Sequence, residues 1–188
     1  MSTHIDTVIH LVSDQTMQNV LPILALRPRR VVQVHSKRED HELRAAATEA
    51  AVRLATGAAD APGQWRGPAA WERRPLEGGK PSIQDTYANV KAALADRDGA
   101  PTCVNFTGGT KYMSVGAWKA AAEAGAPSIY CDTPRAFLSG DTAPLDIPLS
   151  LSAVADHLTV PVFLAAQGLQ PGIGWRDRPI TDDMVTVG

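Results

Sequence analysis

The chain has 188 residues, of which 44% are hydrophobic and 20% are charged, so it can form one core of ordinary size but is short for two independent domains. Its 18 basic and 20 acidic residues give a formal net charge of −2, which excludes a global basic field that would attract duplex nucleic acid or anionic lipid. No long apolar run is present, and no basic stretch leads into an apolar one at the start. We therefore expect no membrane span, no signal peptide and a cytoplasmic location.

Short β-branched apolar runs alternate with amphipathic helical segments along most of the chain. The predicted strands cover residues 7–12, 30–35, 71–76, 102–106 and 128–131. The predicted helices cover residues 19–27, 41–55, 83–94 and 113–124. Strands that alternate with helices of this length imply right-handed βαβ units, so we predict an α/β fold of the Rossmann-like, three-layer kind with a mostly parallel central sheet.

The sequence also predicts the cap of the first helix and the nature of one long loop. Asn19 is expected to cap the first helix, with Pro22 in the first turn, where a missing N–H costs little. Residues 57–67 are rich in glycine, alanine and proline, which predicts a surface loop rather than a domain linker.

The pattern changes after Asp132, where proline and glycine interrupt short apolar runs. We expect short edge strands near residues 136–138 and 145–148, with a direction that could be antiparallel. A last helix is expected over residues 150–158, capped by Ser150 or Ser152, and residues 168–188 are expected to form a loosely structured tail. The chain therefore divides into a ligand-binding domain, residues 1–150, and a C-terminal helix and tail, residues 151–188.

Two polar loops follow predicted strands at the edge where open α/β sheets bind ligands, at residues 13–16 and 107–111. In the second loop, Gly108 and Gly109 let the backbone approach a ligand closely. The start of the following helix offers unpaired N–H groups, and Lys111 adds a full positive charge. These parts together suit a phosphate group.

Neither common nucleotide-binding motif is present. The pattern G-x-x-x-x-G-K fails because residue 104 is Val, and the dinucleotide pattern G-x-G-x-x-G is also missing. A tight strand-to-helix turn with a solvated lysine would account for the two glycines by themselves. However, Asn105, Thr107 and Thr110 place three hydrogen-bonding side chains around the same loop, which is more than a turn requires.

Three stretches of the sequence carry a resemblance: residues 11–24, residues 31–36, and residues 105–113, which read N-F-T-G-G-T-K-Y-M. Over roughly residues 5–150 the chain resembles a CARF domain, the CRISPR-associated Rossmann fold, and most of all the CARF half of two-domain type III CRISPR ancillary nucleases. The resemblance implies a homodimer that binds a cyclic oligoadenylate second messenger across its two-fold axis. It also implies that the loops at 13–16 and 107–111 form the floor of the ligand site.

The candidate ligand-binding residues share these loops and the helix starts beside them. They are Ser13, Asp14, Gln15, Thr16, Asn19, Asn105, Thr107, Gly108, Gly109, Thr110, Lys111 and Met113. The expected ligand is cyclic tetra-adenylate, although the residues do not distinguish it from the hexa-adenylate.

The chain departs from the two-domain relatives because it has at most 38 residues beyond residue 150, whereas those proteins carry an output domain there. A free-standing CARF protein resembles the ring nucleases, which open the cyclic messenger and end antiviral signalling. A CARF unit cut from a longer protein would be a sensor without catalysis, part of a larger nuclease or regulator. An unrelated nucleotide-binding α/β protein is the third alternative.

The side chains fit a ring opening that needs no metal or cofactor. The ribose 2′-OH would attack the adjacent phosphate in line and leave a 2′,3′-cyclic phosphate, so the protein need only hold this geometry and neutralise the developing charge. The resemblance assigns the charge to Lys111 and the orienting hydrogen bonds to Ser13 and Thr107 as catalytic residues. No general base is evident, because His10 and His35 fall inside predicted strands.

Other groups have ordinary structural explanations. The turn-rich aspartates Asp132, Asp141 and Asp146 are a weak candidate for a metal site, because Asp is common in turns. Cys103 and Cys131 lie in apolar runs without CxxC spacing, so we expect two reduced core thiols.

Two further groups of side chains could contact nucleotides. The four tryptophans could stack on adenine, and one of them could be a dimer contact instead: they are Trp65, Trp71, Trp175 and, as the dimer candidate, Trp118. The basic residues near the second strand are expected to form a solvated face rather than a nucleic-acid site: they are Arg27, Arg29, Arg30, Lys37 and Arg38.

Overall fold

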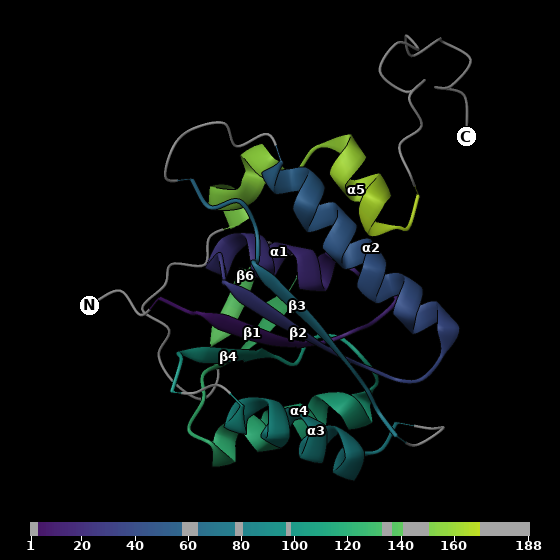
Figure 1. Cartoon of the computed structure of the whole chain (residues 1–188), viewed down its shortest axis with the longest axis vertical. Helices are drawn as coiled ribbons and strands as arrows, with labels where there is room; N and C mark the ends of the chain where they lie inside the picture. Colours follow the sequence, from purple (N-terminus) through teal and green to yellow (C-terminus); the bar gives the residue numbers. More distant parts are fainter. Residues whose placement is uncertain are drawn as a thin grey trace, which may run out of the picture.

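The computed structural model describes residues 4–57, 64–77, 81–96, 99–132, 137–140 and 151–169. In chain order the elements are β1 (Thr7–Leu11), α1 (Met17–Leu26), β2 (Arg30–His35), α2 (Glu39–Thr56), β3 (Ala70–Pro75), α3 (Ile83–Ala95), β4 (Thr102–Asn105), α4 (Lys111–Glu123), β5 (Ser128–Asp132), β6 (Phe137–Gly140), the 3₁₀ helix η1 (Leu151–His157) and α5 (Val160–Ala166). Figure 1 shows the sheet between two helical layers, with α1, α2 and α5 on one side and α3 and α4 on the other.

The sheet has the strand order β3-β2-β1-β4-β5-β6. All pairs from β3 to β5 are parallel, and β6 is antiparallel to β5 at the edge. This arrangement confirms the predicted Rossmann-like α/β fold. The chain builds the sheet outward from β1 to β3 and then returns to place β4 on the other side of β1, so the strand order reverses between β1 and β4.

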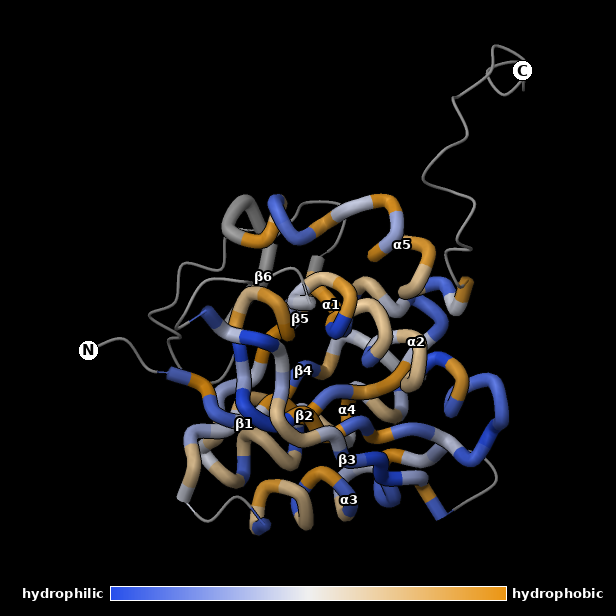
Figure 2. The backbone as a smooth tube through the Cα atoms, turned by 45° about the horizontal axis from the view of Figure 1, so that its top comes forward, coloured by the Kyte–Doolittle hydropathy of each residue, from blue (hydrophilic) through white to orange (hydrophobic). Residues whose placement is uncertain are grey.

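Alternate residues of the central strands enter two separate hydrophobic clusters. Val8, Val31 and Cys103 are fully buried on the face covered by α1, α2 and α5, and their neighbours in sequence face α3 and α4. Figure 2 shows hydrophobic segments on the helices of both layers where they flank the sheet. Burial on both faces explains why these strands are almost continuously apolar instead of alternating apolar with polar residues.

The first helix begins earlier than predicted, and the expected cap is wrong. Thr16 is the N-cap residue of α1, and Asn19 lies inside the helix, fully buried. The Asn19 side chain donates a hydrogen bond to the Leu11 carbonyl at 3.0 Å, at the end of β1. Because α1 packs on the sheet, the Leu11 carbonyl at the end of β1 is shielded from water and requires a hydrogen-bond donor from the protein. The Asn19 side chain supplies this donor and does not cap the helix.

Pro22 also lies in the helix interior, not in the first turn. A proline there removes the hydrogen bond that its N–H would give to the carbonyl four residues earlier, which belongs to Gln18. The Asn105 side chain fills this vacancy, since its Nδ2 donates to the Gln18 carbonyl at 2.9 Å. The end of β4 is thereby tied to α1.

The other predicted strands and helices begin and end within one or two residues of the observed ones. The segment expected to be a helix over 150–158 is the 3₁₀ helix η1, and α5 was not predicted. α5 is only seven residues long and contains Pro161, so its sequence carries little helical signal, and it forms by packing on α2. The edge strand near 136–138 is β6, whereas the strand expected at 145–148, most of the 57–67 loop and the tail beyond residue 169 lie outside the described residues.

The two cysteines are free and buried, as expected of core thiols. Burial raises the pKa of the Cys103 thiol to about 12, which keeps it protonated and unreactive. Among the described helices, none combines the length and the apolar character needed to cross a bilayer.

Four of the five basic residues near β2 form ion pairs: Arg29 with Asp6, Arg30 with Glu72, Lys37 with Glu77, and Arg38 with Asp40. Their charges are balanced by neighbouring carboxylates, so they form a solvated, paired surface, as predicted, and not a basic patch.

Gly116 sets the spacing of α3 and α4, because a Cβ at this position would lie 2.5 Å from the Ile83 carbonyl oxygen. We predict that Gly116→Ala lowers the free energy of unfolding by about 1–3 kcal/mol through overpacking, although alanine is the better helix former. Urea unfolding measures the change. Ala122→Ser, on the exposed face of the same helix, should stay within about 0.5 kcal/mol, and a stabilised Gly116→Ala would contradict the close packing.

Candidate functional site

The loops that follow β1 and β4 touch each other at the point where the strand order reverses. Open α/β sheets bind ligands outside the carboxyl ends of their strands at this point. A Cβ on Gly108 would collide with the Leu11 carbonyl oxygen and would lie 3.3 Å from Ser13 Oγ. Only glycine fits there, so Gly108 brings the two predicted loops into one site.

The second loop ends at the N-terminus of α4. The Thr110 side chain caps this helix by accepting a hydrogen bond from the Met113 N–H at 3.3 Å. Gly109 adopts φ 75°, a left-handed conformation that favours glycine. Lys111 is the first helical residue, is exposed, and forms no ion pair with any residue that the structure describes. The first turn contains no acidic residue, so helix dipole and lysine together favour an anion.

Asn105 is the fully buried centre of the hydrogen bonds that hold this loop. Its Nδ2 donates to the Gln18 carbonyl, and its Oδ1 accepts from the Thr107 N–H at 3.1 Å and from the Thr107 hydroxyl at 2.6 Å. Thr107 Oγ1 in turn accepts from the Cys131 N–H at 2.6 Å. One amide therefore connects β4, α1 and β5 at the start of the glycine loop.

The hydrogen bonds of the Thr107 hydroxyl limit the catalytic role predicted for it. Its only hydroxyl proton is donated to Asn105, so the hydroxyl has no donor left for a 2′-OH or a phosphate. In this conformation Thr107 holds the loop and does not offer a catalytic hydrogen bond.

The predicted site residues divide into an exposed group and a supporting group. Asp14, Gln15, Thr110 and Lys111 are exposed at the ends of the two loops. Thr16, Asn19, Asn105 and Met113 are fully buried and cannot contact a ligand with their side chains in this conformation.

Two of the buried residues have structural partners that the sequence does not reveal. The Thr16 hydroxyl donates to the Ala166 carbonyl and so ties the start of α1 to α5. A Cβ on Gly109 would lie 3.0 Å from the Met113 sulfur, so Met113 packs underneath the glycine loop. Both side chains support the loops from within.

Ser13 is half-buried, and its Oγ is covered by protein atoms yet has no hydrogen-bond partner in the described part of the chain. A buried hydroxyl without a partner costs free energy, roughly 1–3 kcal/mol. A ligand atom that accepted its proton would recover this cost, although the hydroxyl must first turn outward from the contact with Gly108.

The two strand histidines lie in the core, as predicted. His10 and His35 are at most 1% exposed. Burial lowers the pKa of His10 to about 3, so the ring stays neutral, and neither ring nitrogen has a partner among the described residues. Neither histidine reaches the surface to act as a general base.

The tryptophans considered for adenine stacking lie in different places. Trp65 donates from Nε1 to the Pro28 carbonyl at 3.1 Å, and both Trp65 and Trp71 pack against the core cluster beneath α1 and α2. Trp118 is 42% exposed on α4, and Trp175 lies outside the described residues. Of the aspartates considered for a metal, Asp132 is the last residue of β5, and Asp141 and Asp146 are not described.

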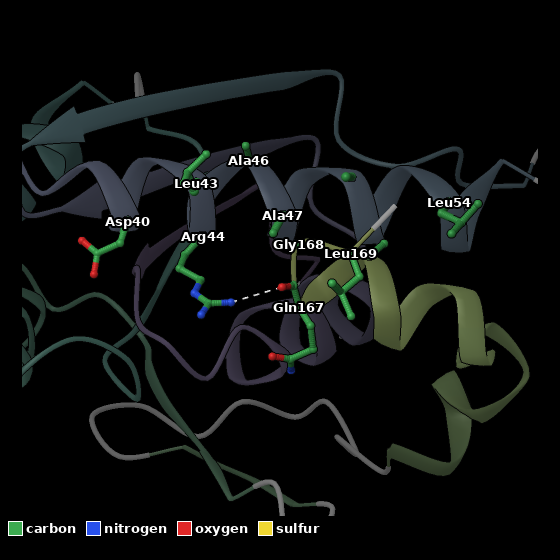
Figure 3. A pocket seen from close by; sticks show the side chains of 11 residues that line it. Asp40, Leu43, Arg44, Ala46, Ala47, Leu54, Gln167, Gly168 and Leu169 are labelled. Atoms are coloured by element: carbon green, nitrogen blue, oxygen red, sulfur yellow. Dashed lines mark hydrogen bonds between the residues drawn. The ribbon is translucent and has the colours of Figure 1, made fainter. Parts of the chain in front are cut away.

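Sequence reasoning did not identify the side chains at the start of α2. A groove of about 620 Å³ runs between α2 and α5, and Asp40 and Arg44 line its polar part (Figure 3). Arg44 donates to the Gln167 carbonyl at 3.3 Å and lies 3.9 Å from Asp14 of the β1 loop. Twenty-six or more positions separate these residues from Asp14 in the sequence, and only the pairing of β1 with β2 brings them together.

Comparison with solved structures supports the Rossmann-like assignment. The fold is similar to that of Can2 from Sulfobacillus thermosulfidooxidans in complex with cyclic tetra-adenylate, with a TM-score of 0.56 and 23% identity over 86% of this chain and 40% of that chain. It is also similar to VC1899 from Vibrio cholerae, with a TM-score of 0.62 and 11% identity over 86% of this chain and 39% of that one.

A third similar structure is Enterococcus italicus Csm6 bound to cyclic hexa-2′-fluoro-hexa-dAMP, with a TM-score of 0.51 and 12% identity over 80% of this chain and 37% of that chain. The chain thus spans about two fifths of the length of these proteins. No protein-family model and no curated protein matches the sequence. The shared feature is the fold, and it is the fold that the resemblance to CARF domains implied.

We predict that Asn105→Ala lowers the free energy of unfolding by about 2–4 kcal/mol, because it removes several buried hydrogen bonds and leaves the Gln18 carbonyl unpaired. Asn89→Ala, which removes one half-buried bond to the Asp85 carbonyl on α3, is the matched control and should cost about 1 kcal/mol or less.

A double-mutant cycle with Pro22→Ala isolates the bond to Gln18. Alanine at position 22 restores an N–H that can bond the Gln18 carbonyl, so Asn105→Ala should cost about 1 kcal/mol less in that background. Equal costs in both backgrounds would show that Asn105 does not compensate for the proline.

Proposed function

We propose that this chain is a CARF domain that binds a cyclic oligoadenylate, with cyclic tetra-adenylate as the expected ligand, in type III CRISPR antiviral signalling in the cytoplasm. The observation that carries the proposal is the contact between the two loops at the strand-order reversal, with the N-terminus of α4, which has no acidic residue in its first turn, and Lys111 beside it. This arrangement suits a phosphodiester, because the backbone N–H groups at the start of the helix lie next to one unpaired, exposed cation in the sequence.

A cyclic ligand with repeated nucleotides is matched by two copies of one site, so we propose a homodimer with the ligand on its two-fold axis. Each protomer would contribute one Lys111 and one pair of loops. Two of the similar structures, Can2 and Csm6, are complexes with cyclic adenylates, which supports this ligand class.

We further propose that the protein opens the ring slowly. The ribose 2′-OH attacks the adjacent phosphorus, the P–O5′ bond breaks, and the products are a 2′,3′-cyclic phosphate and a free 5′-OH. Lys111 would stabilise the charge that develops on the phosphate oxygens, and Ser13 would orient the attacking hydroxyl once its own hydroxyl turns toward the ligand. Thr107 would act by holding the loop through Asn105. Slow turnover is expected because the two strand histidines, His10 and His35, are buried and cannot take the proton.

Incubation of the chain with labelled cyclic tetra-adenylate and hexa-adenylate in EDTA tests binding and cleavage together. Linear products ending in 2′,3′-cyclic phosphate are expected from the tetra-adenylate. Intact ligand that co-elutes with the protein would select the sensor alternative, and no co-elution of either ligand would contradict the proposed function.

We predict that Lys111→Ala weakens binding of cyclic tetra-adenylate by about 1.5–3 kcal/mol per site, the range for a lost charge-assisted hydrogen bond. Lys111→Arg should restore the charge but not the geometry, and so recover only part of the affinity. Lys91→Ala on α3 removes an exposed cation from another helix and should leave calorimetric affinity unchanged. Parental affinity in Lys111→Ala would refute the phosphate site.

Ser13→Ala should reduce cleavage more than binding. We expect a lower single-turnover rate at saturating protein, with a dissociation constant changed by less than about tenfold, or roughly 1.4 kcal/mol. Thr159→Ala, at an exposed hydroxyl that caps nothing, is the control. Activity that EDTA abolishes and that manganese restores equally in the parent chain and in Asp14→Asn would instead require a metal in the reaction itself.

Light scattering tests the proposed dimer. We predict a dimer at micromolar concentration in the presence of cyclic tetra-adenylate, because one protomer provides half of the ring contacts. A monomer both with and without the ligand would exclude the two-fold site.

A further inference from the structure

Three side chains that commonly bind metals meet beside the β1 loop. Asp14 comes from that loop, whereas Asp40 and His41 come from the first turn of α2. One carboxylate oxygen of each aspartate and one ring nitrogen of His41 all lie within 4.8 Å of one another. Small side-chain rotations would bring such a set to the distances that a single bound cation requires.

His41 is already held in place for such a role. Its side chain is buried, since the residue is only 8% exposed. Nδ1 is hydrogen-bonded to the Ser36 hydroxyl at 2.7 Å, so Nε2 is the ring nitrogen left to bind a metal. Metal-binding histidines typically have one ring nitrogen fixed by a protein group, which orients the ring and leaves the other nitrogen for the metal.

The surrounding charges decide whether a cation can enter. Arg38 binds both oxygens of Asp40, with Nε–Oδ1 at 3.0 Å and Nη2–Oδ2 at 2.6 Å. The Arg38 side chain is 66% exposed, and exposed ion pairs are weak enough for a cation to displace them.

Arg44 is the second cation near the cluster, on the other side. Its Nε lies 3.9 Å from Asp14, beyond the distance of a direct hydrogen bond, and its Nη1 is bonded to the Gln167 carbonyl (Figure 3). It can therefore remain in place while Asp14 binds a metal.

We propose that Asp14, Asp40 and His41 bind one divalent transition-metal ion. An imidazole with two carboxylates favours ions such as Zn²⁺, Mn²⁺ or Co²⁺ over Mg²⁺ and Ca²⁺, which prefer oxygen ligands alone. Water would complete the coordination. The ion would fix the loop that contains Ser13 to the start of α2 and would take no part in the 2′-OH attack, so this inference does not depend on the proposed function.

Titration of the EDTA-treated chain with Co²⁺, followed by calorimetry and visible absorption, tests the site without any nucleotide. We expect one ion per chain, absorption bands typical of nitrogen and oxygen ligands, and no displacement by equimolar Mg²⁺. His41→Gln and Asp14→Asn should each weaken Co²⁺ binding at least tenfold. His4→Gln and Asp156→Asn change an exposed histidine and an exposed aspartate elsewhere and should have no effect.

Arg38→Gln gives the most specific result, because it frees the Asp40 carboxylate and should tighten Co²⁺ binding several-fold. Arg53→Gln, which breaks an ion pair with Glu49 on the same helix, should not. If His41→Gln unfolds, as circular dichroism would show, the exposed Asp14→Asn and Arg38→Gln variants still decide. Absence of saturable Co²⁺ binding at millimolar concentration, or binding that Asp14→Asn leaves unchanged, would overturn the proposal whether or not the chain binds cyclic oligoadenylate.

Discussion

The buried amide of Asn105 is the interaction on which the geometry of the candidate site depends. It ends β4, supplies the hydrogen bond that Pro22 removes from α1, and fixes Thr107, which in turn bonds to β5. An amide suits this position because it donates and accepts at once, and every one of these partners is buried or half-buried. The cost of leaving such groups unpaired makes the arrangement rigid.

This rigidity explains how a loop of two glycines can form a defined binding surface. Gly108 presses the loop against the end of β1, and Gly109 turns the chain so that α4 begins immediately afterwards. The N-terminus of α4 and Lys111 therefore follow directly on the loop at the point where the strand order reverses. The buried residues supply the geometry, and the exposed residues supply the charge.

Local patterns predicted the strands and the longer helices because apolar periodicity reports burial directly. They failed where the contacts of a residue are with segments distant in the sequence. Asn19 has the sequence signature of a cap but bonds to the end of β1, and Met113 lies in a candidate motif but packs in the core. The meeting of Asp14 with Asp40 and His41 depends on the pairing of β1 with β2, which no local pattern contains.

The central claim is that an anionic cyclic nucleotide contacts the two loops at the strand-order reversal. Amide chemical-shift mapping by NMR during titration with cyclic tetra-adenylate tests this directly, because each backbone N–H reports its own environment. The largest shifts should occur at Gly109, Lys111 and residues 13–15. Shifts confined to the groove between α2 and α5, around Leu54 and Leu169, or no saturable shifts at all, would contradict the account.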